Sequence, residues 1–482
     1  MGRDDLLHIP VLRFGREYRS MDLKDVSAYR DGEVLAQVSQ ANAGMVRRDV
    51  RKLQRAGSGL DELSSADLIR ICAEAAELFL QAELPVNEEG QTQSVDEYVA
   101  ALSATSGLPH NMCRRNMEKI AVVLRGMRGI LSGLMRGLDP ALLETGVGLA
   151  GGSPISYART GRNLSVILPS NSPGVNSIWI PALALRTPVV LKPGREEPWT
   201  PLRIVRALIA AGCPADAFGF YPTDHEGAGN LLELCDRSLL FGDEGTTARY
   251  AADDRIQIHG PGRSKVFMGS DVIDQWPDHL DVLVSSILDN GGRSCINASA
   301  IFVPRHAKEI AAAIAERIGA VAPTDADDPD ARLSAFANPK YAEFIDQSID
   351  SGLKSGGATD VTAGVRTGPR RQLVDGATYL APTLVHCESL DHPLANTEYM
   401  FPFASVVQVP EEQLPDAAGP SLVVTAITRD ASLRERVLAS PLIDRLNLGP
   451  VPTSHVEWDQ PHEGNLFEFL YERRAIQTAE GW

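Results

Sequence analysis

Between Asn163 and Ile258 short apolar runs alternate with segments of helical periodicity, and this alternation limits the fold more than any other feature. Because strands that are joined through helices pair in parallel, the pattern predicts a doubly wound parallel sheet, and the fold class is α/β. The predicted strands are Leu164–Leu168, Pro188–Leu191, Phe218–Tyr221, Leu239–Phe241 and Arg255–Ile258. The predicted helices are Val175–Leu185, a segment from Thr200 to near Gly212, and Glu226–Leu234.

Ligands of a doubly wound sheet bind beyond the carboxyl ends of its strands. The residues at those ends include Pro169, Ser170, Asn171, Lys192, Gly242 and His259. An amide such as that of Asn171 can donate to a developing oxyanion, although a turn-forming role between two prolines is the alternative. Lys192 can bind a ribose hydroxyl or a phosphate, or can simply be solvated. These ends are therefore the candidate binding edge.

One thiol lies in a segment that suits nucleophilic chemistry. Cys295 follows the pair Gly291–Gly292 and precedes Ala298–Val303, a predicted strand. Glycines adopt backbone angles that other residues avoid, so the chain can turn amides toward a bound carbonyl oxygen. Arg293 is close in sequence, and a nearby cation favours the reactive thiolate. A buried, unreactive cysteine at the start of a strand is the alternative.

The segment Gly146–Gly151 matches G-x-G-x-x-G but lacks the setting of a dinucleotide-binding turn. That turn needs a strand before it, a helix after it and an acidic residue about 20 positions later. Here the β-like run Ile155–Ala158 follows, and no Asp or Glu occurs between Glu144 and Glu196. We therefore predict a glycine-rich loop that leads into a hairpin.

The first part of the chain is predicted to be mostly helical. Apolar residues recur at helical spacing over Ser65–Leu84, Val95–Ser103 and Asn111–Leu134, after a short apolar start. The methionines of the third segment are predicted to fill core gaps, since thioethers are flexible.

The C-terminal tail is interpreted as an assembly surface. Residues 449–465 alternate as a strand does, and Leu466–Arg474 is predicted to be a helix. Trp458 and His462 are assigned to an interface, with a role at a neighbouring subunit's site as the alternative.

Composition limits the partners. The 482 residues hold 63 acidic and 46 basic side chains, a net charge of −17, without a basic stripe that carries interleaved aromatics. Such a field repels polyanions, so nucleic acid is not an expected partner. The six scattered cysteines predict neither disulfides nor a metal site. The charged start, Met1–Asp5, and the lack of a long apolar run predict no membrane span and a cytoplasmic protein.

Four segments together resemble the aldehyde dehydrogenase superfamily, over roughly residues 60–450. They are Pro169-Ser-Asn-Ser-Pro173, Val190-Leu-Lys-Pro193, Asn290-Gly-Gly-Arg-Ser-Cys295 and Glu398-Tyr-Met-Phe-Pro402. The third is one residue longer than the corresponding loop of the family. The resemblance implies a Rossmann-like cofactor domain, an α/β catalytic domain with the thiol, and a small β oligomerisation arm that pairs subunits into homodimers or homotetramers.

The resemblance also implies roles for single residues. Cys295 would attack an aldehyde, and Asn171 with the Cys295 amide would hold the oxyanion. Lys192 would bind the adenosine ribose and Glu398 the nicotinamide ribose of NAD or NADP. The other residues that would line the cofactor site are Pro169, Ser170, Phe241 and Gly242.

The chain departs from the family at the general base. Hydrolytic members have Glu-Leu-Gly-Gly-Lys, whereas this chain has His259-Gly-Pro-Gly-Arg263. Without a glutamate to activate water, an acyl-cysteine should persist until another nucleophile such as coenzyme A arrives. The N-terminal stretches Ile9–Leu12 and Ala66–Phe79 also look similar to acyl-CoA reductases of the bioluminescence type. His259 is itself a candidate base, since imidazoles titrate near neutral pH, and a local hydrogen bond is the alternative.

Two further departures concern the cofactor. The family's Lys-Pro-x-Glu is Lys192-Pro-Gly-Arg195, and the guanidinium of Arg195 suits the 2′-phosphate of NADP. Glu196 or Glu197 can replace the missing acid after a one-residue slip, so the preference for NADP is slight. The family's Phe-Thr-Gly-Ser turn is Phe241-Gly-Asp-Glu244, whose acids can repel a pyrophosphate.

We therefore expect a dinucleotide-binding part over residues 1–143 and 161–258, a catalytic domain over 259–445, and an arm with the tail over 144–160 and 446–482. The expected function is NAD(P)-dependent conversion between an aldehyde and an acyl thioester through an acyl-cysteine, with coenzyme A as a possible co-substrate and an aldehyde or acyl-CoA as the small-molecule partner. A hydrolytic aldehyde dehydrogenase and a non-catalytic binding protein are the alternatives.

Overall fold

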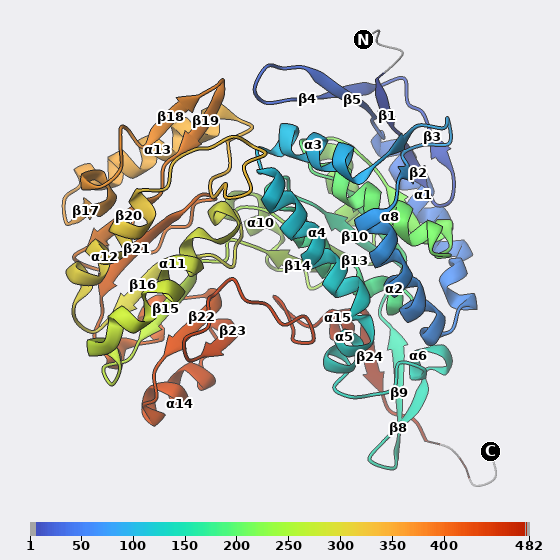
Figure 1. Cartoon of the computed structure of the whole chain (residues 1–482). Coiled ribbons are helices and arrows are strands. Elements are labelled where there is room, and N and C mark those ends of the chain that lie inside the picture. The colour runs from blue at the N-terminus through green and yellow to red at the C-terminus, as the bar shows by residue number, and fades with distance from the viewer. Residues whose placement is uncertain (1–5, 478, 480–482) are drawn as a thin grey trace.

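Two α/β units stand side by side, and a narrow β arm extends below the unit on the right of Figure 1. The structure is a computed structural model that describes residues 6–477 and 479. Our interpretation of the charged start, Met1–Asp5, concerns residues outside this described part. Each unit is built around one seven-stranded sheet, which confirms the predicted α/β class.

Five parallel strands form the centre of the first sheet, in the order β14-β13-β10-β11-β12. β10 comes first of these in the sequence and lies between β13 and β11, so the strand order reverses there, as in doubly wound folds. β2 and β3 continue the sheet in antiparallel fashion beyond β12. The predicted doubly wound sheet is thus confirmed. Its strands are β2 (Val11–Arg13), β3 (Glu17–Tyr18), β10 (Leu164–Ile167), β11 (Val189–Lys192), β12 (Phe218–Phe220), β13 (Arg237–Phe241) and β14 (Ile256–His259).

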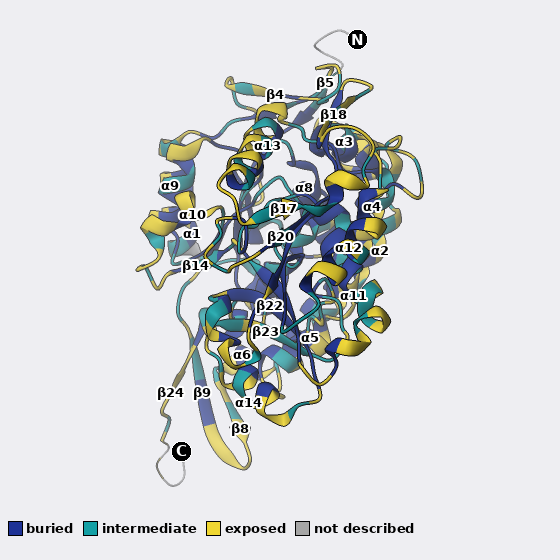
Figure 2. Ribbon diagram, turned by 90° about the vertical axis from the view of Figure 1, so that its left-hand side faces the viewer, coloured by how far each residue is buried: buried dark blue, intermediate teal, exposed yellow. Residues whose placement is uncertain are grey.

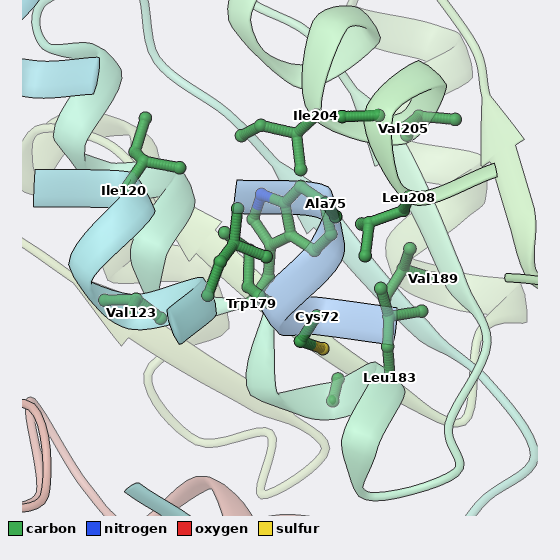
Figure 3. Close-up of a cluster of buried hydrophobic side chains, with 14 of the residues drawn as sticks. Cys72, Ala75, Ile120, Val123, Trp179, Leu183, Val189, Ile204, Val205 and Leu208 are labelled. Carbon is green, nitrogen blue, oxygen red and sulfur yellow. The ribbon is translucent and has the colours of Figure 1, made fainter. Parts of the chain in front are cut away.

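Helices cover this sheet because its central strands are apolar on both faces. Trp179 lies fully buried among side chains of the covering helices, including Cys72 and Ile204 (Figure 3). Its indole nitrogen donates to Asn176 Oδ1 at 2.9 Å, so its one polar atom is satisfied in the core. The helices of this unit are α1 (Ala43–Ala56), α2 (Ser65–Gln81), α3 (Val95–Ser106), α4 (His110–Arg125), α5 (Met127–Leu134), α7 (Pro181–Ala184), α8 (Trp199–Ala210), α9 (His225–Leu234) and α10 (Glu244–Thr247).

The second sheet has the order β17-β20-β21-β16-β15-β22-β23, and every pair except β17 with β20 is parallel. The Cys295 segment enters this sheet at the amino end of β16, whose residues are all buried. The strands are β15 (Ser264–Met268), β16 (Ala298–Val303), β17 (Ala358–Asp360), β20 (Thr383–Cys387), β21 (Phe403–Gln408), β22 (Ser421–Ile427) and β23 (Ile443–Leu448). The helices are α11 (Leu280–Leu288), α12 (Ala307–Gly319), α13 (Pro339–Lys354) and α14 (Ala431–Ala439).

The arm is a three-stranded antiparallel sheet made by β8 (Val147–Ala150), β9 (Ser153–Arg159) and β24 (Tyr471–Arg474). The predicted hairpin is present, but the glycine-rich segment is not a loop that leads into it: Gly146–Gly151 contains β8, the first strand of the hairpin, and the start of the turn to β9. The hairpin tip is exposed, including Leu149 (Figure 2). Pairing of subunits through this arm stays a prediction.

Three local predictions were wrong. The single helix predicted over Asn111–Leu134 is divided at Gly126 into α4 and α5. The predicted helix Val175–Leu185 is a 3-10 turn, Pro173–Ile178, followed by the short α7. Residues 449–465 contain no strand, and the predicted helix Leu466–Arg474 is α15 (Leu466–Leu470) followed by β24. Glycine disfavours a helix interior, which accounts for the break at Gly126, and Pro181 lacks the amide hydrogen that a continuous helix would need. In the tail, hydrogen bonds such as that of Ser454 to Asp289 hold an irregular path.

Smaller elements complete the described chain. β14 ends at His259 and β23 at Leu448, slightly past the predicted boundaries after residues 258 and 445, and those boundaries stay a prediction. Among the described residues, no helix is both long and apolar enough to cross a membrane. The same part of the chain has no group of three or more His, Cys, Asp or Glu side chains that could hold a metal ion. The remaining strands and helix are β1 (Leu7–Ile9), β4 (Leu23–Ser27), β5 (Val34–Ser39), β6 (Leu84–Pro85), β7 (Thr92–Gln93), β18 (Arg371–Val374), β19 (Ala377–Leu380) and α6 (Leu142–Thr145).

Candidate active site

One cavity of about 410 Å³, here called the main cavity, brings together most of the predicted site residues. It lies where the carboxyl ends of β10, β13 and β14 meet the Cys295 segment. Lys192 and Arg195 are not among its lining residues, so the structure does not bring these two predicted residues to the cavity wall. The predicted residues that line it are Pro169, Ser170, Asn171, Phe241, Gly242, His259, Cys295 and Glu398.

The segment before Cys295 folds into a tight turn with unusual backbone angles. Asn290, Gly291 and Gly292 have φ values of 52°, 63° and 66°, in the left-handed region that glycine tolerates best. Asn290 accepts a hydrogen bond at 2.8 Å from Asn116 of α4, which holds the turn from the other unit. The predicted use of the glycine pair to bend the chain is confirmed.

Gly292→Ala is expected to destabilise the fold by more than about 3 kcal/mol and to remove most activity, because a Cβ there overlaps the backbone of Phe401 and adds left-handed strain. Gly137→Ala is the matched control, since Gly137 also has a positive φ, of 77°, but open space around it. It should cost only about 1–2 kcal/mol. Chemical denaturation of both variants measures the difference, and equal losses would contradict the tight packing of the Cys295 turn.

Cys295 is half-buried at the cavity wall. Burial raises the pKa of its thiol well above the ordinary value, and the nearby acids Glu463 and Glu398 raise it further. The amides of Cys295 and Ile296 oppose this rise by donating toward the sulfur. Our prediction that Arg293 promotes the thiolate was wrong, because its guanidinium turns away and donates to the Ser106 carbonyl oxygen at 2.7 Å. A base must therefore remove the thiol proton when the site is used.

Asn171 lies beside this thiol. Its side-chain nitrogen donates one hydrogen bond to the Arg293 carbonyl oxygen at 3.1 Å. Its second N–H makes only a weak contact, with Met400 Sδ at 3.6 Å. A thioether is a poor acceptor, so this second N–H can turn to a stronger one such as an oxyanion. The geometry suits the predicted role.

His259 is held on two sides. Its Nδ1 pairs with a Glu463 carboxylate oxygen, and its ring stacks on Phe241 with centroids 4.5 Å apart and planes 17° apart. The second Glu463 oxygen accepts from the Gly260 amide at 3.1 Å. Among the described residues His259 Nε2 is buried without a hydrogen-bond partner. A carboxylate on Nδ1 fixes the tautomer in which Nε2 is an acceptor, as a general base requires.

Glu463 was missed by the sequence analysis. It lies 204 residues after His259, in the tail, so no local motif joins the two. Glu463 and Gly464 have φ values of 51° and 105°, and this left-handed turn points the carboxylate at His259. Burial acts to raise the pKa of Glu463, but its hydrogen bond and charge interaction with His259 outweigh this effect, so the net shift of the pKa is downward.

Glu398 also faces the main cavity. Burial raises its pKa to about 7, although the Arg263 amide donates to its carboxylate and opposes this rise. Its other oxygen, Oε1, is buried and has no partner within the described chain. Such an acceptor needs a donor from outside the protein, for example a ribose hydroxyl.

The two acids that follow Lys192, Glu196 and Glu197, lie in different environments. Glu196 lines the main cavity and its charge acts on Lys192, whose pKa is lowered by burial. Glu197 is buried and caps α8 through the Thr200 amide at 2.9 Å. Arg195 is exposed. The acid of this loop, rather than its cation, therefore lies on the cavity wall.

A second, smaller cavity of about 120 Å³, here called the tail cavity, shares Cys295 and Asn171 with the main cavity. Trp458 and His462 line it, with Lys119 of α4. Both tail residues thus lie at this chain's own thiol. Their role at an interface between subunits stays a prediction. The tail crosses from β23 to α15 beneath the junction of the two units (Figure 1).

Residues 17–414, most of the chain, match the model of the aldehyde dehydrogenase family. The chain belongs to the aldehyde dehydrogenase family. Among relatives, aminoacetaldehyde dehydrogenase of Pseudomonas aeruginosa is 31% identical over 240 residues, which cover 45% of this chain and 46% of that protein. Betaine aldehyde dehydrogenase of Vibrio vulnificus is 23% identical over 404 residues, or 79% and 76% of the two chains. The chain thus spans about half the length of the first of these relatives.

Solved structures show the same aldehyde dehydrogenase fold. The crystal structure of aldehyde dehydrogenase KauB from Pseudomonas aeruginosa has a TM-score of 0.79 at 18% identity, covering 98% of this chain and 97% of that one. A crystal structure of indole-3-acetaldehyde dehydrogenase complexed with NAD+ has a TM-score of 0.79 at 20% identity, with the same coverage. The predicted kinship with acyl-CoA reductases stays a prediction.

Proposed function

We propose that this chain oxidises aldehydes to carboxylic acids with NAD+, through a thioester on Cys295. The single observation that carries the proposal is the main cavity, whose wall holds a thiol, a side-chain amide and an imidazole with one nitrogen that no described residue contacts by a hydrogen bond. These are the nucleophile, the oxyanion donor and the base that acyl chemistry needs.

Cys295 and Asn171 act in the first half of the reaction. Cys295 gives its proton to a base and attacks the aldehyde carbon, which forms a carbon–sulfur bond and places the charge on oxygen. The Asn171 side chain and the Cys295 amide donate to that oxygen. A nicotinamide bound beside this adduct would supply the hydride acceptor, and loss of the hydride leaves a thioester on Cys295.

The second half belongs to His259. Its Nε2 takes a proton from water, the resulting hydroxide attacks the thioester carbon, and the carboxylic acid leaves while Cys295 recovers its thiolate. Glu463 holds the imidazole and balances the positive charge that forms on it. The glutamate that we found missing at position 259 is thus replaced by a His–Glu pair, which removes the main ground for a CoA-dependent release.

The cavity residues fit a nicotinamide cofactor. The unpaired Glu398 Oε1 can accept from a ribose hydroxyl, and Pro169, Ser170 and Gly242 form a wall at the carboxyl ends of the strands. Asp243 caps α10 by accepting from the Thr246 amide at 2.8 Å, and Glu244 pairs with Arg263 at 2.7 Å. Both acids are therefore partly satisfied within the protein, which reduces the repulsion that we expected toward a pyrophosphate.

We propose NAD rather than NADP as the cofactor, because Glu196 and not Arg195 lines the cavity. Glu196→Gln is expected to lower kcat/KM for NAD by about 10- to 100-fold, the effect of losing a charge-assisted hydrogen bond, and to change kcat/KM for NADP less. Arg195→Gln is the matched control and should change neither value more than about twofold. Steady-state kinetics with both cofactors measure this, and a selective loss of NADP use in Arg195→Gln would restore our first preference.

An aldehyde panel assayed with NAD+, with and without coenzyme A, tests the reaction type. We expect NADH formation that coenzyme A does not accelerate, and a free carboxylic acid as product. Strict dependence on coenzyme A, with an acyl-CoA product, would favour the acyl-transferring alternative. Absence of NADH with every aldehyde, together with no calorimetric signal for NAD or NADP, would favour the non-catalytic alternative.

A further inference from the structure

The tail cavity is the space into which the substituent of an aldehyde substrate would extend. It is lined by Asn171–Ser172 and Ser294–Ile296, and otherwise by α4, the Pro173–Ile178 turn and the C-terminal tail. The residues assigned to the cofactor are not part of its wall. If the nicotinamide occupies the main cavity, the aldehyde's own substituent must extend into this second space. The inference therefore rests on the proposed function.

Lys119 is the one lining residue of the tail cavity with a formal charge at neutral pH, within the part of the chain that the structure describes. It is partly buried, and no described carboxylate lies within 4.0 Å of its nitrogen. Burial lowers the pKa of Lys119, with Asp289 opposing and Arg115 adding to the shift. A partly buried cation without a partner is costly, and a bound anion relieves that cost.

Asp289, the acid whose charge acts on Lys119, already accepts a hydrogen bond from another residue. Asp289 is not a lining residue, and its carboxylate accepts from Ser454 Oγ of the tail at 2.6 Å. Asn116, one helical turn before Lys119, is also engaged, because its side-chain oxygen accepts from Ser172 Oγ at 3.4 Å while its nitrogen donates to the Met112 carbonyl oxygen. Neither residue is placed to satisfy the ammonium group.

His462 adds a neutral polar group to the same cavity. Burial lowers its pKa to about 4, so the ring is uncharged at neutral pH. Its Nδ1 is buried and has no hydrogen-bond partner among the described residues. In the tautomer with a proton on Nδ1, this nitrogen donates one hydrogen bond and offers an oxygen ligand a second contact beside Lys119.

We propose that Lys119 and His462 form an anion subsite, so that the preferred substrates are short aldehydes that carry a carboxylate at the end opposite the carbonyl. The small volume of the tail cavity limits the chain to a few carbons. A cationic aldehyde of the same length meets a like charge and is the poorest substrate of the set.

The test compares ω-oxo acids of two to five carbons with their methyl esters, which keep the shape and remove the charge, and with 3-aminopropanal. We expect kcat/KM for the best acid to exceed that for its ester by at least about 10-fold, and Lys119→Met to remove this advantage while leaving the ester little changed. Lys119→Arg should keep the preference. Arg115→Met, which removes an exposed cation of the same helix outside the cavity, is the control and should change the ratio less than about threefold.

Failure of the inference and failure of the proposed function give different results. Equal use of acids and esters, or an equal loss for both in Lys119→Met, overturns the anion subsite and leaves aldehyde oxidation standing. If no aldehyde is oxidised, binding still decides the inference: dicarboxylates of matching length should raise the Tm of the wild type and not of Lys119→Met. No rise in the wild type overturns the subsite.

Discussion

Replacing Cys295 by serine is expected to lower kcat for aldehyde oxidation by about 10⁴-fold or more. The hydroxyl is a far weaker nucleophile than the thiol, and it holds its proton much more tightly against the base that deprotonates Cys295. Its smaller atom keeps the packing of the half-buried site, so the fold should persist. The rate of NADH formation measures the loss, and circular dichroism checks the fold.

A second thiol supplies the control for this substitution. Cys387 is buried on β20, outside both cavities, and burial raises its pKa to about 12, so it is unreactive at neutral pH. Cys387→Ser should keep at least about half of the wild-type kcat, because surface or core changes away from the site act mainly on stability. If Cys295→Ser retained activity similar to that of Cys387→Ser, Cys295 would not be the nucleophile.

The second large effect is expected in the His259–Glu463 pair. His259→Asn should lower steady-state kcat by about 10²- to 10⁴-fold, the usual contribution of a general base. One equivalent of NADH per active site should still form, because hydride transfer precedes hydrolysis of the thioester. Rapid mixing resolves this burst from the slow steady state.

Glu463→Gln separates the positioning residue from the base. It keeps the shape of the side chain and removes the charge beside His259 Nδ1, so the loss in kcat should be smaller, about 10-fold, with KM little changed. A glutamine variant with wild-type kcat, together with an active His259→Asn, would remove the pair from the mechanism.

Sequence patterns predict the parts of this site that depend on local structure. Asn171 follows β10 and His259 is the last residue of β14, strands whose apolar runs are visible in the chain, and parallel pairing brings their carboxyl ends to one edge. The turn at Gly291–Gly292 is likewise local, because its backbone angles are those that glycine favours. These positions could be found before any contact was known.

Features that depend on distant packing could not be predicted. Arg293 is near Cys295 in sequence, yet its guanidinium donates to the carbonyl oxygen of Ser106 at the end of α3 and points away from the thiol. Glu463 meets His259 only because the tail crosses between the two units after β23. The alternation of residues 449–465 suggested a strand, whereas hydrogen bonds such as that of Ser454 to Asp289 hold the segment as an irregular wall of the tail cavity.

The most direct test of the account is mass spectrometry of His259→Asn after reaction with NAD+ and an aldehyde. The account predicts one acyl group, bound as a hydroxylamine-sensitive thioester on the peptide that contains Cys295, and formed only when NAD+ is present. An adduct on any other cysteine, or NADH formation without an acylated Cys295, would contradict it.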